Sequence, residues 1–369
     1  LEPLGEGAAD MVYDDLTEAV GQVVERVSTP WTREDARTLA ALAAAGLIFV
    51  AALLLATTPP DALTALDPQA VTRYNLIAGA IGIVSALLVT ATSVVMTRKY
   101  PQASGIALAH TVPLLTAAAA LRLSQSHWDT AGWAWTGLGF LIGSLAVLTL
   151  TKRYRISIAA PLVVGTVLAA TGLLVRLGQL SQAGVSAILF ALMIVLLQVA
   201  PWIALAHIPV RILDADTTEQ IPAKGITDQV STSFVFVVAL RSGGAIAALF
   251  LTVSLMTAPE PRSVSLPLTL IMLGAVSLVL QTRSIRARVE VLLGALSGLI
   301  VILVATVLGA YADPRTMPWL TLSAIATALV LVITNVVGPR ARPHLTRIAD
   351  TISVLSLFVL LPLAVYLWS

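Results

Sequence analysis

The sequence predicts an all-α integral membrane protein with about eleven transmembrane helices. Of its 369 residues, 57% are hydrophobic and only 11% are charged, whereas a soluble domain carries about 25% charged residues. The apolar residues lie in long continuous runs, and about 20 apolar residues cross a bilayer as a helix. Only helices and closed barrels satisfy their backbone groups in lipid. These runs are too long for barrel strands, so helices are expected.

Eleven runs have the length and composition of a span. The first six are Leu39–Ala56, Leu76–Met96, Ala103–Leu121, Ala131–Leu150, Ile156–Val175 and Ala183–Ala206. The other five are Leu240–Ala258, Val264–Gln281, Val291–Ala310, Met317–Val337 and Thr351–Trp368. We therefore expect six spans in residues 38–206, a cytosolic loop at residues 207–233, and five spans in residues 234–369.

The basic residues give the orientation, because cytoplasmic loops hold an excess of Lys and Arg. With a cytosolic N-terminus, 16 of the 22 Lys and Arg residues fall on the cytosolic side and 5 on the outer side, and Arg241 remains at the edge of a span. All seven Trp residues fall near predicted span ends, as expected of indoles at membrane interfaces. The C-terminus is therefore predicted to lie outside.

Residues 1–37 are predicted to form a cytosolic linker with an amphipathic helix. Apolar residues recur at three- and four-residue spacing between Met11 and Val27, and acidic residues occupy the other side. An acidic face argues against binding to anionic lipid, which leaves packing on protein or a solvated linker helix. The sequence begins with Leu1 rather than Met, so we expect a further segment before it.

Ionisable groups at membrane depth are costly and usually functional, so we searched the spans for them. None of the 20 acidic residues falls within a predicted span, which argues against a proton-coupled transporter. Arg241 is the candidate for a charge at membrane depth. We expect it to snorkel to the cytosolic interface, with Phe234–Ala239 along the surface. The alternative is a buried Arg241 paired with a partner.

Two further features predict contacts between helices. His110 lies within the third span without a carboxylate or second His at metal-ligand spacing, and we expect it to hydrogen-bond another helix. Small residues at four-residue spacing let helices approach closely. They are Ala78 with Gly82, Gly139 with Gly143, and Gly294 with Gly298. Packing within the chain and contact with a partner subunit both remain open.

The sequence carries no motif for catalysis or for a cofactor. A phosphate-binding loop, an H-E-x-x-H zinc motif and a G-x-S-x-G nucleophile elbow are all missing. The chain has no cysteine, which excludes thiolate catalysis and Cys-ligated metal. A formal net charge of +2 is too balanced for a nucleic-acid binder. We therefore expect no enzyme, no metal and no cofactor.

Several segments together resemble EccD, the multi-spanning membrane component of the type VII (ESX) secretion systems of mycobacteria and other actinobacteria. They are the Arg-rich turn Gln281–Arg288, the run Pro343–Asp350, the segment Pro362–Tyr366 in the final span, Ala200–Trp202 at the end of the sixth span, and the amphipathic helix leading to Trp31. The resemblance covers the whole chain. The family carries a ubiquitin-like domain at its N-terminus, and this sequence starts after where that domain would end.

The resemblance implies a non-catalytic scaffold in the bacterial inner membrane. EccD-like proteins pair as two copies, enclose a lipid-facing vestibule, and join EccB, the ATPase EccC and EccE in a complex that exports proteins. Six basic residues on the cytosolic side are candidates for contact with EccC or EccE: Arg283, Arg286, Arg288, Arg340, Arg342 and Arg347. The alternative for each of them is that it belongs to the usual excess of basic residues on the cytosolic side and contacts lipid headgroups. The alternative function for the chain is a secondary transporter or permease for a small apolar or lipid-like substrate.

Overall fold

The computed structural model describes residues 33–57, 68–99, 104–125, 130–150, 156–206, 223–258, 264–282, 288–318, 320–322, 325 and 342–368. Within these ranges the chain forms helices joined by short turns, with no strand. The first six long helices are α2 (Arg33–Thr57), α4 (Pro68–Lys99), α5 (Ser104–Leu123), α6 (Thr130–Leu150), α7 (Ala159–Gly178) and α8 (Gln182–Ala206). They are followed by α9 (Ala223–Met256), α10 (Ser265–Gln281), α11 (Arg288–Ala312), the short 3₁₀ helix η3 (Pro314–Thr316) and α13 (Arg342–Trp368).

The predicted membrane protein class is confirmed. In the described part of the chain, nine helices are long and apolar enough to cross a membrane, and α10 is an apolar helix of 17 residues. Ten of the eleven predicted spans thus coincide with a helix. Most of the predicted span Met317–Val337 lies outside the described residues, as does the predicted amphipathic helix between Met11 and Val27.

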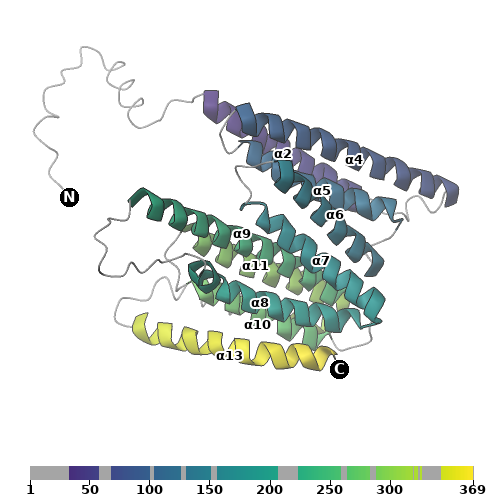
Figure 1. The fold of residues 1–369 in the computed structure, drawn as a ribbon. Coiled ribbons are helices and arrows are strands. Elements are labelled where there is room, and N and C mark those ends of the chain that lie inside the picture. Colours follow the sequence, from purple (N-terminus) through teal and green to yellow (C-terminus); the bar gives the residue numbers. More distant parts are fainter. Residues whose placement is uncertain are drawn as a thin grey trace, which may run out of the picture.

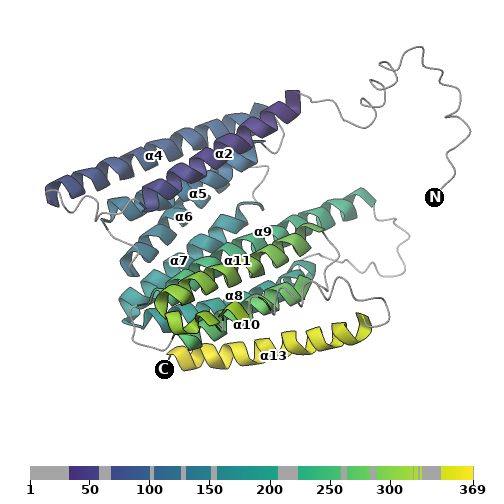
Figure 2. The same ribbon diagram turned by 180° about the vertical axis from the view of Figure 1, so that it is seen from behind.

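The helices form two groups joined by α7. Helices α2, α4, α5 and α6 make one group, and α8, α9, α10, α11 and α13 make the other (Figures 1 and 2). Helix α7 packs on α6 on one side and on α9 on the other. The larger core lies in the second group around Phe190, Leu251, Leu270 and Leu360, which are all fully buried. This group also contains the buried ion pair between Arg241 and Glu290.

The small residues predicted to permit close helix approach do so within the chain. An added Cβ on Gly82 would lie 2.9 Å from the Cβ of Ala119 on α5, and one on Gly139 would lie 2.5 Å from the carbonyl oxygen of Thr116 on the same helix. Gly298 faces α10, where an added Cβ would lie 2.9 Å from the carbonyl oxygen of Ala275. These glycines therefore serve packing between helices of one chain.

His110 makes the predicted contact between segments. One ring nitrogen lies 2.8 Å from the carbonyl oxygen of Ile106 in its own helix, and the other lies 3.1 Å from the carbonyl oxygen of Ser157, in the turn before α7. The histidine thereby ties α5 to the start of α7. This contact has no metal-ligand character, because both partners are backbone carbonyls.

Candidate functional site

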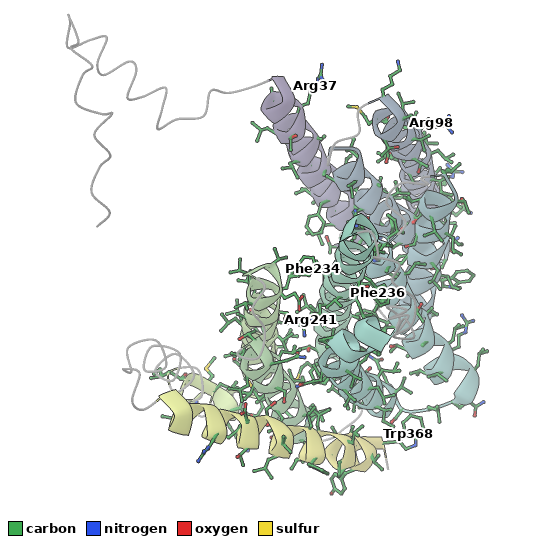
Figure 3. All side chains as sticks on the ribbon, turned by 60° about the vertical axis from the view of Figure 1, so that its left-hand side comes forward. Arg37, Arg98, Phe234, Phe236, Arg241 and Trp368 are labelled. Atoms are coloured by element: carbon green, nitrogen blue, oxygen red, sulfur yellow. The ribbon has the colours of Figure 1, made fainter. Side chains whose placement is uncertain are left out.

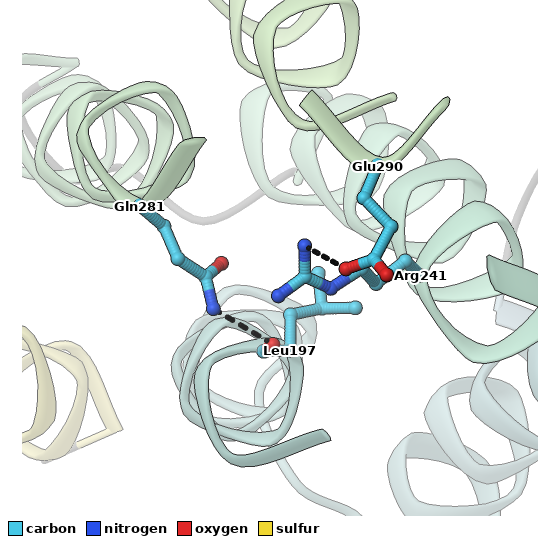
Figure 4. Close-up of polar contacts among 4 residues, drawn as sticks. All are labelled: Leu197, Arg241, Gln281 and Glu290. Atoms are coloured by element: carbon cyan, nitrogen blue, oxygen red, sulfur yellow. Dashed lines mark hydrogen bonds and ion pairs between the residues drawn. The ribbon is translucent and has the colours of Figure 1, made fainter. Parts of the chain in front are cut away.

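A buried ion pair joins α9 to α11 in the second group of helices. The Nη1 of Arg241 lies 3.0 Å from the Oε2 of Glu290, and the two side chains are only 6% and 11% exposed (Figure 4). Arg241 comes from the middle of α9, and Glu290 comes from the first turn of α11. Two opposite charges are thus held at contact distance where little water reaches them.

This arrangement corrects the prediction for Arg241. We expected the transmembrane part of α9 to begin near Leu240, with Arg241 at the interface and Phe234–Ala239 along the surface. Instead α9 is one continuous helix from Ala223, and Arg241 is buried inside the bundle (Figure 3). The apolar segment before Arg241 continues the helix, and the part of α9 that is apolar enough to cross a membrane begins at Thr232 and includes Arg241.

The expectation that no acidic residue lies within a span is wrong at Glu290. The predicted span began at Val291, whereas the part of α11 that is apolar enough to cross a membrane runs from Val289 to Ala312. Removing an unpaired charge from water is expensive, and a buried pair is tolerated only when its geometry is good. A carboxylate in the first turn of a helix is also favoured by the positive end of the helix dipole. Glu290 therefore meets two favourable electrostatic partners, the guanidinium of Arg241 and the N-terminal end of α11.

A second polar contact lies beside the ion pair and supplies a hydrogen bond that α8 lacks. Pro201 lies inside α8 and has no backbone N–H, so the carbonyl of Leu197, four residues earlier, loses its donor within the helix. The Nε2 of Gln281, at the end of α10, donates to this carbonyl oxygen at 3.1 Å (Figure 4). A side chain of α10 thereby replaces the missing bond of α8 and fixes the two helices together.

The chemistry open to this cluster is narrow. Within the described residues, no group of three or more His, Cys, Asp or Glu residues could hold a metal ion. The Nε and Nη2 of Arg241 are buried and have no hydrogen-bond partner among the described protein atoms. The cluster of Leu197, Arg241, Gln281 and Glu290 therefore joins helices, and it contains neither a nucleophile with a base nor a chain of proton carriers.

A second buried arginine lies at the other end of the bundle. Arg122, one of the five basic residues predicted on the outer side, lies in the last turn of α5 and is only 6% exposed. Its Nε donates to the carbonyl oxygen of Leu55, in the last turn of α2, and its Nη1 lies 3.5 Å from the Oδ1 of Asn75 on α4. A cation at the C-terminal end of a helix interacts favourably with the helix dipole. Arg122 thus joins α2, α4 and α5.

The six basic residues proposed as partner contacts remain untested. Arg283, Arg286 and Arg340 lie outside the described residues. Arg288 and Arg342 are the first residues of α11 and α13, and their side chains are not described. Arg347 is exposed on α13. The described residues therefore do not test whether the six lie together.

Four helices present large apolar surfaces to the outside of the chain. Half or more of the residues in the spans of α5, α6, α7, α8 and α9 are buried, but the share is 11% for α2, 28% for α4, and 22% for α11 and for α13. The exposed side chains include Leu47 at 73%, Leu87 at 66%, Leu303 at 63% and Phe358 at 73%. These helices face lipid or other membrane proteins, because in water they would be unstable.

Sequence reasoning missed Glu290 and Gln281. Gln281 was placed at the boundary between a predicted span and the Arg-rich turn, and Glu290 was placed in the cytosolic connection before the span that begins at Val291. The available signals were the apolar segment before Arg241, which is long enough to extend a helix, and Pro201, which predicts an unbonded carbonyl in its own helix. Neither signal identifies the partner, because the partners come from other helices.

Comparison with known proteins gives one family and a shared fold. The family described as the EccD-like transmembrane domain matches residues 36–369. No curated protein matches the sequence. Two similar solved structures are protomer 1 of the ESX-3 core complex and the MycP5-free ESX-5 inner membrane complex in state II. The first has 18% identity and a TM-score of 0.70, covering 99% of this chain and 82% of that one. The second has 16% identity and a TM-score of 0.55, covering 86% and 76%.

Proposed function

The chain belongs to the family of EccD-like transmembrane domains, and from this premise we propose that it is a non-catalytic scaffold subunit of a type VII (ESX) protein secretion complex. It is a multi-pass protein of the inner membrane. Its task is to hold other subunits in a fixed arrangement within the bilayer. The observation that carries this proposal is the family match over residues 36–369, nearly the whole chain.

The distribution of buried and exposed residues supports a scaffold. Helices α5 to α9 form a closely packed interior, whereas α2, α4, α11 and α13 have apolar faces available to other molecules. Without a hydrophobic driving force in lipid, association between membrane helices depends on close packing and hydrogen bonds. A rigid interior with broad outer faces suits a subunit that positions partners.

The partners that we propose are a second copy of this chain, EccB, the ATPase EccC and EccE. Two copies would enclose a vestibule filled by membrane lipids, and the other subunits would be anchored around it. The two similar solved structures are, by their descriptions, an ESX-3 core complex and an ESX-5 inner membrane complex. At 18% and 16% identity they support a common fold, and assembly with these partners is our proposal.

The basic residues on the cytosolic side are proposed to bind acidic faces of EccC or EccE. Charge reversal of Arg283, Arg286 and Arg288 together is expected to release partner subunits while the chain itself remains in the membrane. The matched control is the replacement of the same three residues by Lys, which keeps the charge and should retain the partners. An intact complex after charge reversal would remove the docking role.

The proposal is tested by purifying the tagged chain from its native membrane in a mild detergent. Native-gel sizing and mass spectrometry then identify everything that purifies with it. A very large particle containing an ATPase and further membrane proteins is the expected result. Recovery of the chain alone, as a monomer or small homo-oligomer, would contradict the scaffold and favour a transporter, which a small-molecule binding assay would then examine.

A further inference from the structure

Arg241 brings more hydrogen-bond donors into the bundle than the ion pair uses. A guanidinium carries its N–H donors in a fixed planar fork, and the contact with Glu290 involves Nη1. The Nε and Nη2 of Arg241 are buried without a hydrogen-bond partner among the described protein atoms. A buried donor without an acceptor is costly, most of all in a charged group. These two nitrogens therefore need an acceptor that is not a protein atom of the described residues.

The side chain of Gln281 lies on the same side of the bundle as these nitrogens. Figure 4 shows Arg241 and Gln281 extending toward each other from α9 and α10. Both helices meet α8 at Leu197: the Nε2 of Gln281 donates to its carbonyl oxygen at 3.1 Å, and an added Cβ on Gly244, close to Arg241 on α9, would lie 2.5 Å from its Cδ2. Because Nε2 bonds to this carbonyl, the orientation of the amide is fixed. Its Oε1 has two lone pairs and accepts only.

We infer that Arg241 and Gln281 form a binding site for buried water. Water accepts hydrogen bonds from the Nε and Nη2 of Arg241, and it donates one to the Oε1 of Gln281. Buried waters in proteins typically make about three hydrogen bonds to polar groups that otherwise lack a partner. The site supplies that number. This inference is independent of the proposed role in secretion.

Two other side chains of the same helices extend the polar surroundings. The Oγ of Ser277 and the Nε2 of Gln198 are also buried without a hydrogen-bond partner among the described protein atoms. Ser277 precedes Gln281 by about one turn and so lies on the same face of α10. Gln198 follows Leu197 on α8. Unpartnered polar atoms thus gather on the segments of α8, α9 and α10 that meet around Leu197.

The charges select water over an anion as the ligand. The guanidinium of Arg241 and the carboxylate of Glu290 already cancel at 3.0 Å, so an added anion would leave a net negative charge where little water reaches it. An uncompensated buried charge is far more costly than a neutral ligand. Glu290 is the more exposed of the two, at 11% against 6%, and it lies in the first turn of α11. Water has its access from that end.

The bound water completes one network across four helices. Leu197 of α8 accepts from Gln281 of α10, Gln281 accepts from the water, the water accepts from Arg241 of α9, and Arg241 pairs with Glu290 of α11. The water therefore joins two contacts that would otherwise act separately. Well-satisfied polar networks of this kind hold a bundle in one arrangement.

The test is water-edited solid-state NMR of the full chain in lipid vesicles, with arginine labelled by ¹⁵N. Transfer of magnetisation from water protons to Nε is expected to be faster for Arg241 than for Arg122. Arg122 is the matched control, because it is equally buried at 6% and its Nε donates to the carbonyl oxygen of Leu55. The double variant Arg241→Gln, Glu290→Gln identifies the Arg241 signals by their loss and removes both charges together. Equal transfer to the two Nε atoms would overturn the inference.

The role of Gln281 is tested against a background in which α8 keeps its hydrogen bond. Pro201→Ala supplies the backbone N–H for the carbonyl of Leu197, so adding Gln281→Met then removes only the amide of the water site. Compared with Pro201→Ala alone, this double variant should lose water transfer to Nη2 of Arg241. Unchanged transfer would contradict the inference. A shift of the Arg241 signals when chloride is replaced by gluconate would show an anion in place of water, and would also overturn it.

Discussion

Replacement of Gly139 by alanine is expected to destabilise the chain, although alanine is the better helix former. An added Cβ would lie 2.5 Å from the carbonyl oxygen of Thr116, 2.7 Å from the Cα of Ala117 and 2.9 Å from the Cβ of Ala120. Ordinary contacts of this kind are about 3.5–4.0 Å long. Helices α5 and α6 would have to separate by about 1 Å at this point.

The size of the effect follows from three contributions to the free energy of unfolding. Forcing an extra carbon into a packed interface costs about 1–3 kcal/mol. Separation of the helices also weakens the hydrogen bond from the Thr116 hydroxyl to the carbonyl oxygen of Gly139, now 2.7 Å long, which is worth about 1 kcal/mol. The higher helix propensity of alanine returns about 1 kcal/mol. We expect a net loss of about 2 kcal/mol.

The assay is the midpoint of thermal unfolding of the purified chain in a mild detergent, followed by fluorescence-detected size exclusion. Gly46→Ala is the matched control, because Gly46 lies within α2 and an added Cβ there would meet nothing within 4 Å. This control should be at least as stable as the parent chain, through helix propensity alone. Equal midpoints for Gly139→Ala and Gly46→Ala would refute the argument that α5 and α6 are in backbone contact at Gly139.

Two other substitutions test the polar contacts between helices. Gln281→Ala should cost about 1–3 kcal/mol, because it leaves the carbonyl of Leu197 unbonded. Adding Pro201→Ala should recover most of this loss, because alanine at this position supplies the missing backbone N–H. A double-mutant cycle on unfolding midpoints measures this coupling. Additive effects of the two changes would contradict the claim that Gln281 replaces the hydrogen bond that Pro201 removes. Arg122→Gln should free the last turn of α2, which hydrogen–deuterium exchange would detect as faster exchange of the amides near Leu55. Unaltered exchange there would exclude the anchoring role of Arg122.

The membrane class and nearly all helices follow from local composition. A run such as Ala131–Leu150 is long and apolar enough to cross a bilayer, and as a helix it satisfies its backbone hydrogen bonds internally, as lipid requires. The predicted contact of His110 with another segment is confirmed. The glycines predicted to permit close helix approach do so, because residues four apart lie on the same face of a helix. Helix ends were less certain, and α9 begins at Ala223 instead of near Leu240.

The interior contacts could not be read from the sequence. Arg241 and Glu290 are separated by the whole of α10 along the chain, and only the packing of α9 against α11 brings them to 3.0 Å. Pro201 signals an unbonded carbonyl, but the donor comes from Gln281 on another helix. Which side chain pairs with which depends on the relative position of whole helices, and a local sequence pattern does not give that position.

The sequence by itself thus determined the membrane environment, the helical class and the resemblance to the EccD family, because these depend on hydrophobic runs and short motifs. The tertiary structure alone decided that Arg241 lies inside the bundle, that Glu290 neutralises it, and that the apolar faces of α2, α4, α11 and α13 remain available. The physical reason is that a charge can stay in a low-dielectric interior only beside its counter-charge. The three-dimensional arrangement supplies that neighbour.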